Sequence, residues 1–498
     1  MKKLSLIFTC IFLVGAAIRA FDVRHTVDRP SWRECDVAGI ARSYYREGMN
    51  LFYPRVDWRG DTPGYAEMEF PLYPWLVAWG YKIFGFDEHV GRIISFVFSL
   101  LTLVVFYRLA RYLLPPVGAI AASIFFTFNP LLINIANSLQ PEGIMLLSYL
   151  LAGYFFIRWL DNESRRDLLS ACAATALTIL AKAPAAHIGI FFMLLLFGKY
   201  GLAAIRQVRL WLFAVGALLP GALWYWHAHK FWTQYGNSLG LSNEYHWAGW
   251  DLFTDPTMIM GVTRSELFYV LMPTGIIIAL LGVYLKWREK PVNYGLCWLA
   301  ATMIYYLVAA RTTGDQWAAY YHTVSLPGYA LLVGSGVEGL RQLKSEAPTF
   351  WRTALRYAGV LSLAGILLFQ TRQIVVDAKN WKPSNLVGCA QSFAAMIPKE
   401  DLVLVTGGVC QDEGYPVAYN ASFMMYWADR KGFNVCIEEQ SLEAVAAFTK
   451  RGAKYFMAAK SSFRYKKHLE EDLRQIYPVL AECDDYCLFQ LKPHDVRD

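Results

Sequence analysis

Apolar runs of about 20 residues recur from residue 4 to residue 370, separated by polar turns, and the pattern then stops. A helix of about 20 residues rises about 30 Å, which matches the hydrocarbon core of a bilayer. The pattern therefore predicts a polytopic α-helical membrane protein with a soluble C-terminal part. We expect about eleven spans, near residues 4–20, 91–112, 116–134, 141–160, 168–186, 187–204, 209–227, 266–286, 292–310, 323–340 and 354–371.

Lysine and arginine residues cluster in every other turn between these runs. Such clusters are typical of cytoplasmic loops, so we expect the N-terminus, with Lys2 and Lys3, in the cytoplasm. Four segments are then expected outside: residues 21–90, 228–265, 311–322 and everything after about residue 373.

The first apolar run, residues 4–20, has two interpretations that leave residue 21 on the same side. It is a retained span, or it is a cleaved signal peptide, in which Lys2 and Lys3 precede a brief apolar stretch and then Gly15-Ala16-Ala17. We favour retention, because Ile18-Arg19-Ala20 is a poor cleavage site.

The tail after residue 373 is predicted to be a small α/β domain. A helix over 441–452 is expected, with Ser441 as its N-cap and Gly452 at its C-cap. Alternating strands and helices indicate a mostly parallel sheet with covered faces. The predicted domains are 1–372 in the membrane, including the first outer loop, and 373–498 outside. The strand-like runs are LVLVTG (402–407), FNVCIEE (433–439), KYFMAA (454–459) and YCLFQL (486–491).

Composition fits a membrane location, because 56% of the residues are hydrophobic and only 17% are charged. The formal net charge of +7 is spread between the apolar runs, so we predict no nucleic-acid partner. No Cys or His spacing is typical of a structural zinc site. Six cysteines on the expected outer side permit disulfides of unknown pairing: Cys35, Cys389, Cys410, Cys436, Cys483 and Cys487.

The stretch SWRECDVAGIARSYYREGMN, residues 31–50, places acidic residues directly before an amphipathic helix. From Asp36 onward one face is apolar, and the pattern ends near Gly48. We expect this helix to lie at the membrane surface, with Asp36 at its start. Asp36 is then either a helix cap, for which Asp is a preferred residue, or a group with a chemical role.

Other ionisable residues are expected at the same outer level of the membrane. Glu67 and Glu69 precede a Phe-Pro in the first loop. Residues of both signs lie near the outer ends of the spans: Arg92, Glu142, Lys182, Arg311 and His322. Such residues often only extend toward the interface. Together they are a candidate site for an anionic lipid headgroup.

Motifs along nearly the whole chain support a family resemblance. They are RECD (33–36), EFPLYPWL (69–76), GRIISFVFSLLTLVVFYRLARYL (91–113), QPEGIMLLSYLLAGYFFIRWL (140–160), LAKAP (180–184) and YYHTVSLPGYALL (320–332). In this order they resemble the GT-C superfamily of polyprenyl-phosphate-sugar transferases, specifically the bacterial relatives of protein O-mannosyltransferases and aminoarabinose transferases. The tail also resembles the outer C-terminal domain of these proteins.

The resemblance implies roles for particular residues. The catalytic carboxylate of the first outer loop falls on Asp36, and the acid before the Phe-Pro falls on Glu69. Lys182 matches a lysine that we assign to the lipid phosphate. Many relatives carry Asp-Glu as the acidic pair, whereas this chain has Glu34-Cys35-Asp36. Glu34 is therefore an alternative base, and we prefer Asp36 because the helix follows it directly.

The implied reaction moves a sugar from a polyprenyl phosphate to an acceptor hydroxyl, with inversion at the anomeric carbon. A carboxylate takes the hydroxyl proton, and Lys182, Arg92 or Arg311 stabilises the departing phosphate. We predict no cofactor, although some superfamily members use a divalent metal. The expected location is the bacterial inner membrane, with the tail in the periplasm. The expected partners are the lipid-linked donor, membrane lipids, and a lipid, glycan or protein acceptor.

Two other classes stay open at this point. A transporter or flippase of polyprenyl-linked sugars would show internal repeats and ionisable residues at mid-membrane, and neither is evident here. A sensor with the tail as its ligand-binding module is the third class. The sequence leaves the sugar and the acceptor undetermined.

Overall fold

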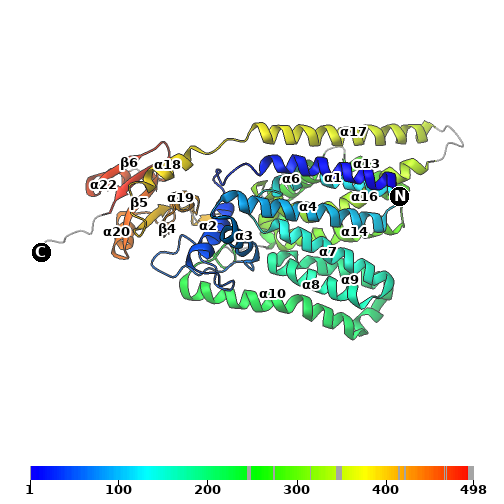
Figure 1. The fold of residues 1–498 in the computed structure, drawn as a ribbon, viewed down its shortest axis with the longest axis horizontal. Helices are drawn as coiled ribbons and strands as arrows, with labels where there is room; N and C mark the ends of the chain where they lie inside the picture. Colours follow the sequence, from blue (N-terminus) through cyan, green and yellow to red (C-terminus); the bar gives the residue numbers. More distant parts are fainter. Residues whose placement is uncertain are drawn as a thin grey trace. The chain divides into compact units, whose positions relative to one another are not determined.

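The computed structural model is mostly α-helical, with one five-stranded sheet near the C-terminus (Figure 1). The structure describes residues 2–243, 248–272, 275–314, 316–343, 350–412, 415–419, 422–464, 466 and 468–491. The chain divides into two compact units, here named the helical unit (1–24, 92–224 and 246–381) and the loop–sheet unit (25–91, 225–245 and 382–498).

The helical unit contains most of the apolar sequence. The boundary between the units falls within two of its helices, α4 (Glu88–Leu113) and α10 (Val208–Tyr235). Its helices are α1 (Lys2–Asp22), α4 (Glu88–Leu113), α5 (Pro116–Thr127), α6 (Pro130–Ile135), α7 (Glu142–Asn162), α8 (Arg165–Ala181), η1 (Ala183–His187), α9 (Ile188–Tyr200), η2 (Gly201–Arg206), α10 (Val208–Tyr235), α11 (Trp250–Thr254), α12 (Pro256–Ser265), η3 (Glu266–Val270), α13 (Gly275–Leu285), α14 (Lys290–Val308), α15 (Ala310–Gly314), η4 (Gln316–Val324), α16 (Leu326–Gln342) and α17 (Phe350–Lys379).

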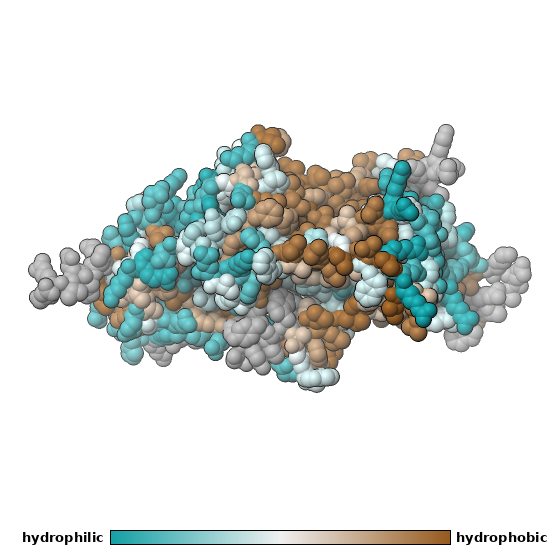
Figure 2. Space-filling model, turned by 90° about the horizontal axis from the view of Figure 1, so that it is seen from below, coloured by the Kyte–Doolittle hydropathy of each residue, from teal (hydrophilic) through white to brown (hydrophobic). Residues whose placement is uncertain are grey.

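Apolar surface on this unit fits a lipid environment. Leu212, Leu219 and Leu223 of α10 are exposed, and Figure 2 shows apolar side chains gathered over the helices of this unit. The expectation of a multi-span helical membrane protein is confirmed. Within the described ranges, five helical segments are long and apolar enough to span a membrane: Glu88–Leu113, Glu142–Asn162, Ala183–Arg206, Val208–Tyr235 and Tyr357–Asp377. The number is six if the bent pair Pro256–Val270 and Gly275–Leu285 is one span.

Several of the other expected spans are formed by interrupted helices. The expected span 116–134 is divided into α5 and α6, and Asn129 caps α6 by accepting a hydrogen bond from the Leu131 N–H at 3.0 Å. The expected span 168–186 is broken at Lys182, whose backbone is extended between α8 and η1. The total of eleven spans therefore stays a prediction.

The loop–sheet unit joins the first loop, the end of α10 and the tail. This grouping differs from the predicted division at residue 372, which keeps the first loop with the membrane helices. Its further elements are α2 (Trp32–Glu47), α3 (Leu72–Phe84), α18 (Asn385–Ala394), β1 (Leu402–Thr406), β2 (Gln411–Asp412), β3 (Tyr415–Pro416), α19 (Ser422–Ala428), β4 (Gly432–Val435), α20 (Leu442–Lys450), β5 (Ala453–Ala459), α21 (Lys460–Phe463), α22 (Leu469–Ile476), β6 (Val479–Glu482) and β7 (Tyr486–Gln490).

The main sheet has the strand order β4-β1-β5-β7-β6. β1 is parallel to β4 and β5, whereas β7 is antiparallel to β5 and β6. The prediction of a mostly parallel sheet is therefore wrong for half of the pairings. The short connection from Glu482 to Tyr486 is a hairpin turn, which forces β6 and β7 to be antiparallel, so only one of these two strands can run parallel to β5, and the strand that pairs with β5 is the antiparallel one. The sheet core is apolar and includes the fully buried Leu404, Phe456 and Phe489.

Capping follows the sequence closely in this unit. Ser441 is the N-cap of α20 and accepts a hydrogen bond from the Ala444 N–H at 3.1 Å, as predicted. Arg451 is the C-cap, so Gly452 lies one position beyond the predicted place and has a φ of 106°. α2 ends at Glu47 with Gly48 as its C-cap, near the predicted end, and Gly48 has a φ of 128°. Positive φ angles of this kind favour glycine.

Four of the six cysteines expected on the outer side are paired. The disulfides are Cys389–Cys483 and Cys410–Cys436, while Cys35 and Cys487 are buried free thiols. Over the described part of the chain, one group has metal-ligand spacing, and it consists of Cys410, Cys436 and Glu438. Its two sulfur atoms are bonded to each other, so they are not thiolate ligands.

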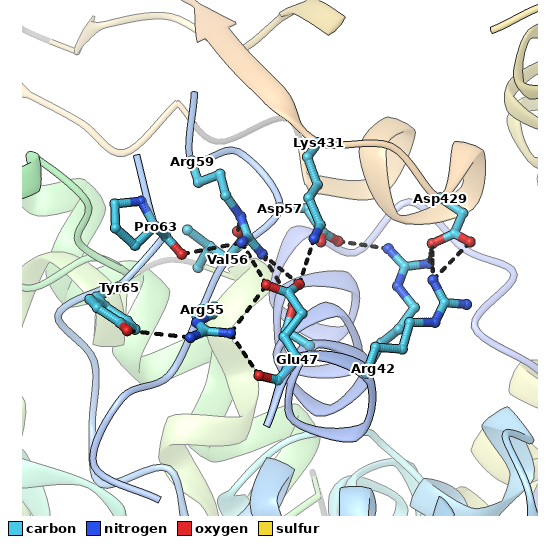
Figure 3. A network of polar contacts seen from close by, with 12 residues as sticks. Arg42, Glu47, Arg55, Val56, Asp57, Arg59, Pro63, Tyr65, Asp429 and Lys431 are labelled. Atoms are coloured by element: carbon cyan, nitrogen blue, oxygen red, sulfur yellow. Dashed lines mark hydrogen bonds and ion pairs between the residues drawn. The ribbon is translucent and has the colours of Figure 1, made fainter. Parts of the chain in front are cut away.

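A buried ion-pair network joins the first loop to the tail within the loop–sheet unit (Figure 3). Arg42 of α2 lies 2.7 Å from the Asp57 carboxylate and 3.0 Å from that of Asp429. Glu47 accepts hydrogen bonds from Arg59 at 2.9 Å and from Lys431 at 2.6 Å. Burial opposes ionisation of Glu47, but these hydrogen bonds lower its pKa to about 2. The network therefore holds α2 against residues distant in the sequence.

Replacing Arg42 by alanine should destabilise the loop–sheet unit strongly. The substitution leaves Asp57 buried without its partner, which typically costs about 3–5 kcal/mol. Arg46 also pairs with Asp429, but its side chain is 45% exposed, so Arg46→Ala should cost less than about 1 kcal/mol. Thermal unfolding of the purified full chain in detergent measures both variants. Equal shifts in the unfolding temperature of the two variants would show that the buried ion pair contributes no more to stability than the exposed one.

Candidate active site

Asp36 lies in the second turn of α2, not at its start. The helix begins at Trp32, and Ser31 is the N-cap, with its hydroxyl accepting a hydrogen bond from the Glu34 N–H at 3.3 Å. The expectation that Asp36 begins the helix is therefore wrong, because Ser31 already supplies the capping oxygen. The position of Asp36 has to be explained by its tertiary contacts.

The Asp36 carboxylate is buried, with 4% of the residue exposed. Its Oδ1 accepts a hydrogen bond from the Trp58 indole N–H at 2.7 Å. Burial raises the pKa of Asp36 to about 7, although the Trp58 hydrogen bond and the charge of Arg33 both favour ionisation. A carboxylate with a pKa near neutrality can accept a proton and release it again at physiological pH.

Glu69 is linked to the same side of α2 through Arg33. The Arg33 guanidinium forms an ion pair with the buried Glu69 carboxylate, and it precedes Asp36 by three residues on one helix face. Glu34 is two residues from Asp36, so the helix directs its side chain to nearly the opposite side. Arg33 thus links Glu69 to the helix face that carries Asp36, whereas Glu34 points away from Asp36.

Glu67, the other acid before the Phe-Pro, holds the loop to the segment after α10. Its buried carboxylate accepts hydrogen bonds from the hydroxyls of Ser238 at 2.7 Å and Ser242 at 3.0 Å. His229 Nδ1 lies 2.9 Å from the same carboxylate. These contacts satisfy most of the acceptor sites of Glu67, which gives it a positioning role in this unit.

In the helical unit, Lys182 and Glu142 form a close pair. Lys182 Nζ lies 2.5 Å from Glu142 Oε1, and Glu142 is fully buried at the first turn of α7. The ammonium also lies 3.8 Å from the ring centre of Tyr321 and 4.6 Å from that of Tyr320. The break between α8 and η1 thus directs a cation to a site with aromatic walls.

His322 belongs to a second buried cluster in the helical unit. Its Nδ1 lies 2.6 Å from Glu266 Oε1, and its Nε2 lies 3.0 Å from the carbonyl oxygen of Thr313. A carbonyl can only accept, so Nε2 carries a proton. The Glu266 carboxylate also accepts a hydrogen bond from Tyr306. His322 is therefore held by Glu266, a residue outside the predicted site.

Arg92 and Arg311 lie at other positions of the helical unit. Arg92 is buried, and its guanidinium donates a hydrogen bond to the Asn137 carbonyl at 2.7 Å, just before α7. It also lies 5.9 Å from the ring centre of Trp381. Arg311 is half-buried in the short helix α15.

The structure adds two residues to the site, and only one of them, Glu266, was recognisable from the sequence. Glu266 begins an expected span, and an ionisable residue there is a functional candidate that could have been selected. Trp58 carried no local signal, because its hydrogen bond to Asp36 joins residues 22 positions apart.

Comparison with solved structures identifies the fold. The structure of ArnT from Cupriavidus metallidurans bound to undecaprenyl phosphate matches with a TM-score of 0.64 and 15% identity, covering 97% of each chain. The archaeal oligosaccharyltransferase AglB from Archaeoglobus fulgidus, in complex with an inhibitory peptide and a dolichol-phosphate, matches with a TM-score of 0.55 and 14% identity. That match covers 91% of this chain and 69% of AglB.

Sequence comparison adds a family match over part of the chain. Residues 62–226 match the family model of dolichyl-phosphate-mannose-protein mannosyltransferase. Among curated protein sequences, none matches this chain. The chain therefore has the GT-C fold, as its motifs predicted, and over residues 62–226 it carries the sequence pattern of the dolichyl-phosphate-mannose-protein mannosyltransferase family.

Proposed function

We propose that this protein is a membrane glycosyltransferase that moves a sugar from a polyprenyl-phosphate donor to an acceptor hydroxyl on the outer face of the membrane. One observation carries the proposal: Asp36 is buried, receives the Trp58 N–H, and has a pKa near 7. The family match and the two fold relatives, one with undecaprenyl phosphate and one with a dolichol-phosphate, support a lipid-phosphate donor.

Asp36 is the general base in this mechanism. It accepts the proton of the acceptor hydroxyl while that oxygen forms a bond to the anomeric carbon. The bond from that carbon to the lipid phosphate breaks, and the attack from the opposite face inverts the carbon. Arg33 and Glu69 keep the environment of Asp36 polar and fixed. Glu34, on the other side of α2, is the weaker candidate.

The residues of the helical unit are proposed to bind the donor. Lys182 is the first candidate to stabilise the charge that grows on the departing phosphate, and Arg92 or Arg311 is the alternative. Glu142 orients Lys182, and His322 is fixed by Glu266 in the same unit. No step is assigned to a metal, because the guanidinium beside Asp36 and Glu69 disfavours a divalent cation there.

The proposed orientation has eleven spans, with the N-terminus in the cytoplasm and the tail in the periplasm of a bacterium. The alternating basic turns support it. A reporter that is active only outside the cytoplasm should be active when fused after residue 498 and silent when fused after Arg288. The reverse pattern would place the proposed base on the wrong side of the membrane.

Substitutions of Asp36 and Lys182 should affect different kinetic constants. Asp36→Asn keeps the size of the side chain but removes the base, so kcat for sugar transfer should fall by about 10²- to 10⁴-fold. Lys182→Ala should raise the KM for the lipid donor, and Lys182→Arg should recover part of it because the charge remains. Steady-state transfer by the purified protein measures both constants.

Matched variants control this experiment. Asp87→Asn alters an exposed carboxylate of the same loop and should leave kcat unchanged. Lys199→Ala removes a lysine that also lies near a carboxylate and a tyrosine ring, so it should leave the donor KM unchanged. Glu34→Gln should reduce transfer less than Asp36→Asn. Full transfer by Asp36→Asn would exclude Asp36 as the base.

The rate of transfer should rise with pH through the pKa of Asp36. The base is active only when ionised, so kcat/KM should increase between about pH 6 and pH 8 around a pKa of about 7. Trp58→Phe removes a hydrogen bond that favours the ionised form, which raises the pKa and moves the profile to higher pH. Trp75→Phe is the control, because its indole N–H donates to the Met49 carbonyl. A profile that Trp58→Phe leaves in place would contradict the assignment.

A further inference from the structure

A cleft of about 580 Å³ lies within the loop–sheet unit and has no role in the mechanism above. Three segments line it: the loop from Trp58 to Thr62, the end of α10 with the residues that follow it, and the sheet domain. Its volume is within the usual range for small-molecule sites, about 300–1,000 Å³.

The side chains of the cleft combine aromatic rings with amides. Trp232, Tyr235 and Tyr419 line it and are each half-buried, so part of every ring faces the cleft or solvent. Asn237 and Asn243 lie in the same wall. Rings provide flat apolar surfaces, and amides both donate and accept hydrogen bonds. A sugar offers the matching chemistry, with C–H groups on its faces and hydroxyls on its edges.

The charges of the cleft select against a phosphorylated ligand. Arg59 lies 2.9 Å from the Glu47 carboxylate, and Arg451 lies 2.7 Å from that of Asp61. Among the described residues, both cations that line the cleft are therefore already neutralised, and Glu439 adds a negative charge. A neutral carbohydrate fits this balance better than an anion.

The cleft is adjacent to the proposed base through one side chain. Trp58 lines the cleft and donates its indole N–H to Asp36 at 2.7 Å. A ligand that contacts Trp58 is thus held one residue away from the carboxylate. This adjacency is what an acceptor site requires.

We propose that this cleft binds the carbohydrate portion of the acceptor, so that the acceptor is a glycan or a glycan-bearing lipid. The inference rests on the proposed function for its link to transfer, but saccharide binding itself can be measured without a donor. The rings of Trp232 and Tyr419 hold the sugar. Asn237 donates one amide hydrogen to the Tyr65 carbonyl at 3.1 Å, and Asn243 Oδ1 accepts a hydrogen bond from the Gly240 N–H at 2.9 Å, so the remaining donor and acceptor positions of these amides contact the sugar hydroxyls.

Binding of neutral tetrasaccharides to the purified full chain in detergent tests the proposal. Maltotetraose and chitotetraose are the probes, glucose 6-phosphate is the anionic comparison, and saturation-transfer NMR reports the contact. At least one tetrasaccharide should bind, and Trp232→Ala and Tyr419→Ala should raise its Kd at least tenfold. Trp226→Ala, on the same helix but outside the cleft and 65% exposed, should leave the Kd unchanged.

Asp36→Asn separates the two proposals, because it should bind the saccharide like the wild type while transfer is lost. Saccharide binding without any transfer that depends on Asp36 would support the cleft and overturn the proposed function. Three results would contradict saccharide binding in the cleft. They are failure of both tetrasaccharides to bind, tighter binding of glucose 6-phosphate, and equal effects of Trp232→Ala and Trp226→Ala.

Discussion

The buried ion pair between Arg42 and Asp57 is the contact on which the loop–sheet unit depends. Asp36, Gly39 and Arg42 follow one another at intervals of three on α2, so they share one face of the helix. A Cβ at Gly39 would lie 2.7 Å from Asp57 Oδ2, so the loop approaches α2 at its smallest residue. Because Asp57 is held there, the next residue, Trp58, reaches Asp36. The structural pair thereby positions the proposed catalytic pair.

Burial of Asp36 lowers the stability of the folded protein when the carboxylate is ionised, and the ion pairs around α2 must offset this loss. Its pKa of about 7, against 3.8 for an ordinary Asp, means that the folded state disfavours the ionised form by about 4 kcal/mol. For a carboxylate with a raised pKa, stability is lost as the pH rises from the unfolded pKa toward the folded one. Asp36 therefore contributes least to the stability of the folded protein at the pH where it is ionised and active as a base. Such a conflict is typical of a functional site.

In the helical unit, the buried charge of Lys182 is stabilised by a carboxylate and by aromatic rings. Lys182 is paired with Glu142 at 2.5 Å, which reduces the penalty of keeping an ammonium among apolar helices. The rings of Tyr320 and Tyr321 add favourable contacts without neutralising it. A phosphate that reaches Lys182 has to compete with Glu142, and its larger negative charge favours that exchange. The proposed donor site is thus a charge pair that can reorganise.

The sequence by itself determined the apolar helices, the alternating basic turns and the acidic residues of the first loop, because hydrophobic periodicity and local motifs are short-range properties. It also located the caps at Ser441 and Gly48 to within a residue. It misplaced Asp36 as a helix start and could not give the antiparallel half of the sheet. Only the tertiary structure decided that Trp58 meets Asp36 and that Arg42 joins Asp57 to Asp429. The physical reason is that burial and hydrogen bonding between distant residues set the pKa and the position of a side chain, and neither is encoded in its immediate neighbours.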